Sequence, residues 1–318
     1  MYLRNIILGE NLISEDYNII RELDPKWAKS YIKISRLKGG LFNKTYIVKD
    51  EEGKRYKVRI PSRGSEFFVN RDVEIMNLRL LEFTGVVPRV VKYKENSKIA
   101  IFEFIPGIPL SKESFKNSEI MKASIKAIKT IHNSGVYFNN TFNVFLEVNR
   151  YYERLKKDGI LKEYGYIANE YPLENFINIT KYIENIIKKS EIKESPCHND
   201  LLPANFILSK NKVYIIDWEF SGMNDPCFDF ANFLAELEIL SDEEEKKALE
   251  LYFGDKASKV RERIDLYKFV SRVFWGLWAM FQFRNSELEF DFENWCRFQF
   301  NEALRYLKRL KEFWFIKI

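Results

Sequence analysis

Residues 196–206 read Pro-Cys-His-Asn-Asp-Leu-Leu-Pro-Ala-Asn-Phe, and residues 215–219, which follow one hydrophobic run, read Ile-Ile-Asp-Trp-Glu. The two stretches place the side chains of Asp200, Asn205 and Asp217 on short loops beside apolar segments that can hold them rigid. Carboxylate and amide oxygens accept protons and bind hard cations such as Mg²⁺. The pattern is therefore typical of a phosphoryl-transfer site.

The spacing of these residues narrows the fold. His-x-Asp, followed five residues later by Asn and then by a strand that ends in Asp, matches the catalytic loop and metal-binding Asp of the protein-kinase-like fold. Asp200 would then be the base, and Asn205 and Asp217 would be magnesium ligands. An ordinary polar turn, with Asp217 capping a strand, explains either stretch alone. It does not explain both at this spacing.

Composition sets the size and class of the protein. With 318 residues, 46% of them hydrophobic, the chain can bury a large core and should form one bilobal unit or two domains. The formal net charge of +5 is too small an excess in a charge-rich chain to indicate nucleic acid as a partner.

The cysteines and apolar runs indicate the compartment. Cys197, Cys227 and Cys296 are widely separated and form neither a zinc-binding pattern nor a disulfide framework, which favours a reducing cytoplasm. The apolar run at the N-terminus is too short for a signal peptide, and the run over 269–283 is interrupted by Arg272 and too short to span a bilayer. We expect a soluble cytoplasmic protein without membrane insertion.

The first third of the chain predicts a small β-rich lobe. Residues 1–30 read as one or two helices with a break at Asp24-Pro25. Alternating apolar patterns then predict an antiparallel sheet of five strands, over residues 31–34, 45–48, 56–60, 88–93 and 99–104.

Two features of this lobe are suited to nucleotide phosphates. The turn Gly39-Gly40 allows backbone N–H groups to approach phosphate oxygens, although Gly-Gly turns are also common in hairpins that bind nothing. Lys57 and Arg59 lie on one face of the third strand, so one of them should reach the phosphates.

A helix is expected over residues 65–83. Its predicted apolar stripe is Val73, Met76, Leu80 and Phe83. Glu74 on the flank of this stripe would pair with the strand cation, the alternative being that both charges are solvated.

A break at Ile105-Pro106-Gly107 suggests the hinge between lobes, where backbone groups near Glu103 and Ile105 would bind adenine. We therefore predict an N-terminal lobe over residues 1–105 and a larger, mostly helical C-terminal lobe over residues 106–318.

Three further polar residues of the second lobe lie on predicted helices. Asp229 lies near the start of a helix, where a carboxylate caps free N–H groups, and we interpret it as structural. His132, at a helix end, is assigned to packing or capping rather than chemistry. Glu236 is either a surface charge or part of a site.

The segment 270–282 carries apolar residues on two helix faces. Ser271, Trp275, Trp278 and Gln282 form the second face, and tryptophan rings of this kind can hold a quaternary ammonium group, with Trp295 as another wall. The alternative is a helix buried on both faces by a large domain, which the pattern alone favours.

Residues 198–205, 216–220, 224–233 and 274–282 together resemble the choline and ethanolamine kinases, and the resemblance extends from about residue 38 to about residue 300. It implies an α+β, bilobal protein-kinase-like fold, related to that of aminoglycoside phosphotransferases. It also implies ATP and Mg²⁺ as co-substrate and cofactor and a small amino alcohol as phosphate acceptor.

The resemblance also assigns roles residue by residue. Asp200 is the base, Asn205 and Asp217 bind Mg²⁺, and Arg59 contacts phosphate with Glu74 as its partner. The nucleotide set is completed by Gly39, Gly40, Asn43, Glu103 and Ile105, and the substrate set by Glu219, Glu236, Trp275, Trp278, Gln282 and Trp295. Ile239-Leu240-Ser241 stands where some relatives have a further tyrosine, so one wall of the aromatic box is expected to be missing.

The predicted activity is ATP- and Mg²⁺-dependent phosphorylation of choline by a monomer or homodimer. Ethanolamine or another small amino alcohol is the first alternative. An aminoglycoside-type phosphotransferase is more remote, because it has no need of a tryptophan cage. A protein kinase is disfavoured by the lack of an activation segment running from Asp-Phe-Gly to Ala-Pro-Glu, and a non-catalytic module would have lost one of Asp200, Asn205 or Asp217.

Overall fold

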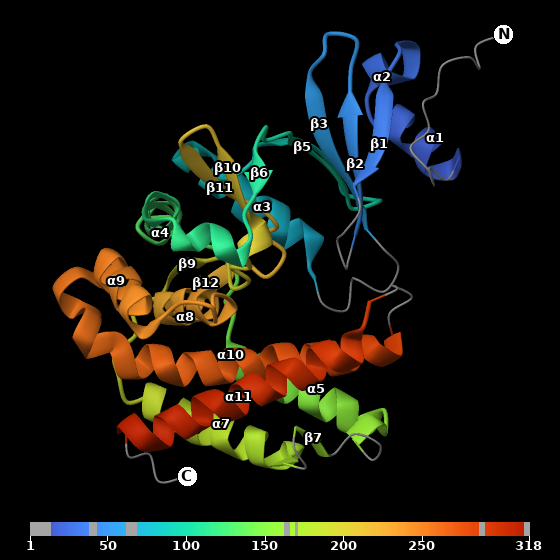
Figure 1. The fold of residues 1–318 in the computed structure, drawn as a ribbon. Helices are drawn as coiled ribbons and strands as arrows, with labels where there is room; N and C mark the ends of the chain where they lie inside the picture. Colours follow the sequence, from blue (N-terminus) through green and yellow to red (C-terminus); the bar gives the residue numbers. More distant parts are fainter. Residues whose placement is uncertain are drawn as a thin grey trace. The chain divides into compact units, whose positions relative to one another are not determined.

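The computed structural model describes residues 14–37, 43–61, 69–161, 166–168, 171–285 and 290–314. The chain forms two compact units, one from Met1–Ile108 with Ile207–Glu219 and the other from Pro109–Phe206 with Phe220–Ile318. We call them unit 1 and unit 2. The class is α+β, as predicted, with the main sheet in unit 1 and mostly helices in unit 2 (Figure 1). The lobe boundary at residues 105–106 stays a proposal.

Unit 1 contains the predicted five-stranded antiparallel sheet, in the order β1-β2-β3-β5-β4. Its strands are β1 (Lys33–Leu37), β2 (Asn43–Lys49), β3 (Arg55–Pro61), β4 (Val90–Lys94) and β5 (Ile99–Glu103). The central strand β3 pairs with β2 through Lys57 and Ile47, and with β5 through Lys57 and Phe102. Gly39 and Gly40, assigned to phosphate binding, lie outside the described residues.

Two short helices cover one face of this sheet. They are α1 (Ser14–Glu22) and α2 (Pro25–Lys29), and Asp24 caps α2 by accepting the N–H of Lys26. Their buried residues Ile20, Leu23 and Trp27 form one core with residues of the strands, among them Tyr46, Val48 and Val58. The N-terminal helices therefore complete the hydrophobic core of unit 1.

The helix after the sheet's first three strands is α3 (Arg71–Leu81), followed by the 3-10 helix η2 (Glu82–Thr84). Its predicted apolar stripe is wrong, because Met76, Leu80 and Phe83 are exposed. The buried face of α3 instead includes Arg71, Glu74 and Leu78. Arg71 and Glu74 can be buried because they form an ion pair with each other.

A second small sheet carries the chain toward Asp217. It consists of β11 (Lys212–Ile215), β10 (Phe206–Ser209) and β6 (Ile108–Pro109), in that order. The backbone N–H of Ile215 donates to the carbonyl oxygen of Val86 at 2.8 Å, which ties this segment to the rest of unit 1.

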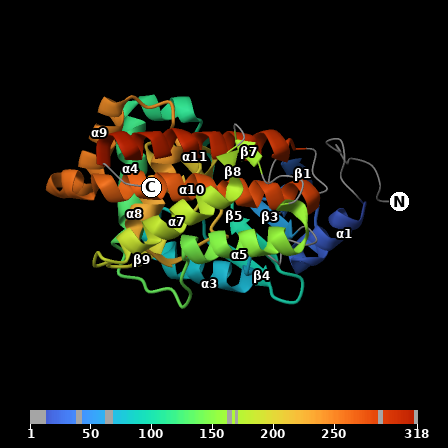
Figure 2. The same ribbon diagram turned by 90° about the horizontal axis from the view of Figure 1, so that it is seen from below.

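Unit 2 is built around one long helix, α10 (Ala257–Asn285). Helix α11 (Phe292–Trp314) runs alongside it, and α5 (Val144–Lys157), α7 (Leu173–Ile187) and α8 (Pro226–Glu236) also pack on it (Figures 1 and 2). A Cβ at Gly276 would lie 2.7 Å from the ring of Phe300, so glycine is needed where α10 meets α11. All residues from Leu266 to Gln282 are buried, which matches a helix covered on every face.

The remaining elements of unit 2 surround this core. They are η3 (Lys112–Lys116), α4 (Ser118–His132), β7 (Tyr166–Ala168), β8 (Tyr171–Pro172), β9 (Ser195–Cys197), η4 (Pro203–Asn205), β12 (Gly222–Asn224), α9 (Asp242–Phe253) and η5 (Gly254–Lys256). Among the described residues, no helix is both long and apolar enough to cross a membrane.

Candidate active site

The loop that carries Asp200 runs from β9 to η4 and is held by helix α8. Both carboxylate oxygens of Asp229 accept backbone N–H groups, Oδ2 from His198 at 2.8 Å and Oδ1 from Asn199 at 2.7 Å. Oδ1 of Asn232, one turn further along α8, accepts the N–H of Leu201 at 2.8 Å. The backbone on both sides of Asp200 is therefore fixed by one buried helix.

The predicted role of Asp229 as a helix cap is wrong. Asp225 caps α8, because its side chain accepts the N–H of Cys227 at 2.9 Å. Asp229 is structural, as predicted, but its carboxylate supports the loop. Nε2 of His132 lies 2.9 Å from Oδ2 of Asp229, and its Nδ1 contacts the hydroxyl of Tyr252. His132 thus packs against Asp229, in agreement with its predicted structural role.

Asn199 has a positive φ of 67°, a conformation that few residues other than glycine adopt. Its side chain is fully engaged, since Nδ2 donates to the carbonyl oxygen of Phe220 at 3.0 Å and Oδ1 accepts from Asn224 at 2.8 Å. Such strain persists only where the surroundings hold it, and it is concentrated at functional sites.

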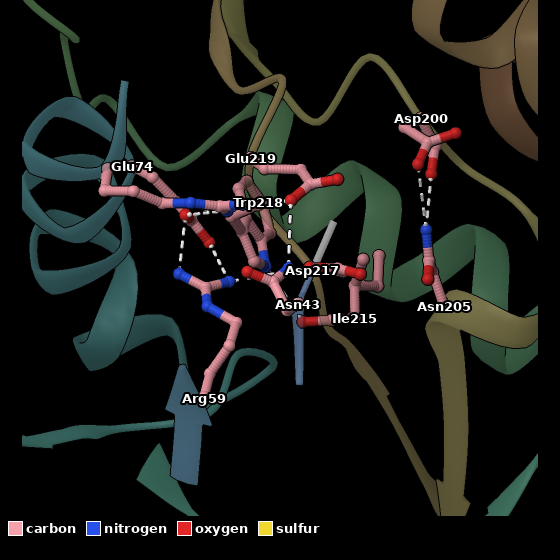
Figure 3. A network of polar contacts seen from close by, with 10 residues as sticks. Asn43, Arg59, Glu74, Asp200, Asn205, Ile215, Asp217, Trp218 and Glu219 are labelled. Atoms are coloured by element: carbon pink, nitrogen blue, oxygen red, sulfur yellow. Dashed lines mark hydrogen bonds and ion pairs between the residues drawn. The ribbon is translucent and has the colours of Figure 1, made fainter. Parts of the chain in front are cut away.

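Asp200 and Asn205 are in direct contact. Nδ2 of Asn205 donates to the backbone carbonyl oxygen of Asp200 at 2.8 Å and approaches its carboxylate at 3.3 Å (Figure 3). This leaves Oδ1 of Asn205 as the atom of its side chain that could bind a metal ion. An amide oxygen is the kind of ligand that Mg²⁺ prefers.

Asp217 lies in unit 1, two residues after the end of β11. Its φ is 71°, the second strained position in the predicted motif. The next residue, Trp218, is fully buried, and its indole N–H donates to the carbonyl oxygen of Ile215 at 2.9 Å. The Asp217 side chain is 32% exposed, so its carboxylate is accessible to a cation. Its hard oxygen atoms suit Mg²⁺.

A buried charge cluster surrounds Arg59. Both of its terminal nitrogens bind Glu74 at 2.6 Å, and Nη1 lies 3.6 Å from Asp217 (Figure 3). The predicted Arg59–Glu74 pair is therefore present, and the solvated alternative is not.

Arg71 extends this cluster. It lies 3.0 Å from Glu74 and 2.8 Å from Glu219. Asn43 also contacts Glu219, with Nδ2 donating at 3.4 Å. Burial, with the nearby charge of Asp217, raises the pKa of Glu219 to about 7, and Arg71 opposes this shift. Sequence reasoning missed Arg71, although its position one turn before Glu74 was a usable signal.

The two predicted adenine contacts lie at the end of the main sheet. Glu103 is the last residue of β5, and its backbone N–H already donates to the carbonyl oxygen of Arg89 at 2.9 Å. A nucleotide contact through the backbone of Glu103 would therefore use its carbonyl oxygen. Ile105 follows in an irregular segment and is half-buried.

Two of the three tryptophans predicted for the aromatic box are in contact in unit 2. Trp275 and Trp278 are buried and meet edge to face, with 5.7 Å between ring centroids. Trp295 joins them indirectly, because it contacts Phe290, which contacts Phe292, which contacts Trp278. Gln282 is buried on the same helix as the two tryptophans.

Glu236 is buried rather than exposed, so its interpretation as a surface charge is wrong. Its carboxylate binds Arg272 of α10 at 2.8 Å, and Arg272 also donates to Gln299 at 2.8 Å. Burial raises the pKa of Glu236 and Arg272 opposes the shift. Glu236 is thus already paired with a cation of the protein.

Unit 1 therefore brings together Asn43, Arg59, Glu74, Asp217 and Glu219, and unit 2 brings together Asp200 with Asn205 and Trp275 with Trp278. Kinase-type phosphotransferases need a fixed carboxylate base, an Asp that can bind Mg²⁺ and a cation for the phosphates. Asp200, Asp217 and Arg59 are residues of these three kinds.

The family model for choline/ethanolamine kinases matches residues 34–252. The chain belongs to this family and is a phosphotransferase with an alcohol group as acceptor.

Named relatives agree with this assignment. The chain is 26% identical to ethanolamine kinase 2 of Rattus norvegicus over 321 residues, which cover 93% of this chain and 82% of the relative. It is 26% identical to protein LicA of Haemophilus influenzae over 280 residues, or 86% and 79% of the two chains. A crystal structure of choline kinase LicA from Streptococcus pneumoniae is similar with a TM-score of 0.78, 28% identity and coverage of 93% and 100%.

Proposed function

We propose that this enzyme transfers the γ-phosphoryl group of ATP to the hydroxyl of choline, in the presence of Mg²⁺. The observation that carries the chemistry is the support of the Asp200 loop by Asp229 and Asn232. It holds the Asp200 carboxylate rigid, as a base that takes the proton of an attacking hydroxyl must be held.

The other residues bind and orient. Asn205 and Asp217 each offer oxygen to Mg²⁺, which when bound neutralises charge on the phosphate oxygens. Arg59, fixed by Glu74, presents its positive charge to the phosphates. Gly39, Gly40, Asn43, Glu103 and Ile105 are proposed to complete the nucleotide contacts.

We favour choline over ethanolamine because of the chemistry of the residues proposed for the substrate. A primary ammonium group has N–H donors that need acceptors, whereas a trimethylammonium group has none. The two carboxylates proposed for the substrate, Glu219 and Glu236, are already bound by Arg71 and Arg272. Aromatic faces such as those of Trp275, Trp278 and Trp295 suit a quaternary ammonium group. Glu219, Glu236 and Gln282 are then not proposed as direct ligands of the cation.

Ethanolamine remains the second candidate, since named relatives include an ethanolamine kinase. We further propose that the enzyme works in the cytoplasm, as a monomer or homodimer, without nucleic acid or membrane insertion. The three buried free cysteines agree with a reducing compartment.

The test is ADP release with choline, ethanolamine and an aminoglycoside as acceptors, each with and without Mg²⁺. We expect the highest kcat/KM for choline and no turnover without Mg²⁺. A higher kcat/KM for ethanolamine would replace choline as the substrate. Preference for the aminoglycoside would place the enzyme in another activity class.

A further inference from the structure

Lys57 lies in the middle of the central strand of the main sheet, on the same face as Arg59. Residues two apart in a strand point the same way. The intervening Val58 is fully buried in the core formed with α1 and α2. Lys57 and Arg59 therefore face away from those helices, and Lys57 is only half-buried.

The cations near this face of the sheet differ in their ion pairs. Arg59 has both terminal nitrogens on Glu74, and Arg71 is shared by Glu74 and Glu219. Lys57, in contrast, has no ion pair and no side-chain hydrogen bond to any residue that the structure describes. Burial lowers the pKa of Lys57, and the charge of Arg59 adds to this, while Asp217, Glu74 and Glu219 oppose the shift. The nearby carboxylates therefore act on the ammonium group without a direct ion pair.

We propose that Lys57 binds the phosphate groups of the nucleotide and is a second phosphate-contacting cation beside Arg59. This inference rests on the proposed kinase function. An anionic phosphate supplies a direct hydrogen-bonding partner, and the lysine ammonium group offers three donors on a flexible stem. Arg59, whose terminal nitrogens are already occupied, positions the phosphates through its fixed charge.

The test compares binding of ADP with binding of adenosine, both by calorimetry in buffer with Mg²⁺ and without any alcohol acceptor. The variants are Lys57→Met, which keeps the length of the side chain, and Lys57→Arg, which keeps its charge. Lys94→Met, an exposed lysine at the end of β4, is the matched control. We expect Lys57→Met to weaken ADP binding at least about tenfold, with adenosine binding unchanged and Lys57→Arg close to wild type.

Two results overturn the role of Lys57 while the wild type still binds ADP. One is unchanged ADP binding in Lys57→Met. The other is an equal loss for ADP and adenosine, which would show a contact with the base or a general distortion. If Lys57→Met fails to fold, the binding of ADP and of adenosine is measured with Lys57→Gln instead, and the same two results decide. Failure of the wild type to bind ADP would overturn the kinase proposal itself, and this inference with it.

Discussion

Asp229 accepts the backbone N–H of Asn199 at 2.7 Å, although the two residues are 30 positions apart in the sequence. The same carboxylate binds His198 and His132, so its removal leaves several buried polar groups without partners. We expect Asp229→Ala to lower the free energy of unfolding by about 3 kcal/mol and to lower kcat.

Urea denaturation and steady-state kinetics measure these two effects. Ser241→Ala removes the cap of α9, where Ser241 bonds to Glu244, and should cost only about 1 kcal/mol with kcat retained. Wild-type kcat in folded Asp229→Ala would show that the support is not needed for turnover.

Replacement of Asp200 should separate chemistry from folding. The loop backbone is held by Asp229 and Asn232, not by the Asp200 carboxylate, so Asp200→Ala should fold with a nearly unchanged Tm. Its kcat should fall at least about 10²-fold, because the hydroxyl loses its base. Asp200→Asn, which keeps the shape, should be similarly slow. Near-normal ADP release in either variant excludes Asp200 as the base.

Removal of Mg²⁺ by a chelator should stop ADP release, and added Mg²⁺ should restore it. In Asn205→Ala, the Mg²⁺ concentration for half-maximal rate should rise at least about tenfold, because an oxygen ligand is lost. Asn96→Ala, at an exposed turn of unit 1, is the control. An unchanged Mg²⁺ requirement in Asn205→Ala would remove this residue from the metal site.

Trp278→Ala should raise the KM for choline by about 3- to 30-fold, with little change in the KM for ATP, since it removes an aromatic face from the cation. Trp278→Phe keeps an aromatic ring, so its KM for choline should lie between those of the wild type and Trp278→Ala. Steady-state kinetics with each substrate varied in turn give both constants. A rise confined to the KM for ATP contradicts the aromatic box.

Glu245 provides a test of acid stability outside the site. Burial alone would raise its pKa, but Lys268 at 2.5 Å and Arg261 at 2.9 Å outweigh burial and hold the pKa below its ordinary value of 4.5. Because the pKa of Glu245 is lower in the folded state than in the unfolded state, its charge stabilises the fold at pH values above the unfolded-state pKa. This stabilisation is lost as the pH falls through the folded-state pKa.

The stability difference between wild type and Glu245→Gln should therefore be largest near neutral pH and shrink below about pH 4.5. Urea denaturation between pH 3 and pH 7 measures it. A stability difference that grows as the pH falls would contradict the stabilising ion pairs of Glu245 with Lys268 and Arg261.

The fold and the local motifs were predictable because their signals are local. Alternating residues mark the strands around Val48 and Val58, and the spacing from His198 to Asn205 marks the loop. The predicted Arg59–Glu74 pair was also correct, since a cation on a strand and an acid on the following helix are a recurring combination.

Errors arose where tertiary partners decide burial. Met76 on α3 and Phe83 on η2 are exposed, whereas Arg71 and Glu74 are buried on α3 as a pair of opposite charges. Glu236 is buried for the same reason, through Arg272. No local pattern shows that Glu236 will meet Arg272, which lies 36 residues further along the chain, and the support that Asp229 gives to residues 198–199 is equally non-local.

Unit 1 is discontinuous in sequence, because Ile207–Glu219 joins it only after the chain has traversed Pro109–Phe206. During synthesis on the ribosome, the main sheet and α3 emerge with Glu74 as the early partner of both arginines. Asp217 and Glu219 arrive about a hundred residues later, roughly 5 to 20 seconds at ordinary elongation rates. Until those residues are made, Glu74 is therefore the one carboxylate of the described part of unit 1 that forms an ion pair with Arg59 and Arg71.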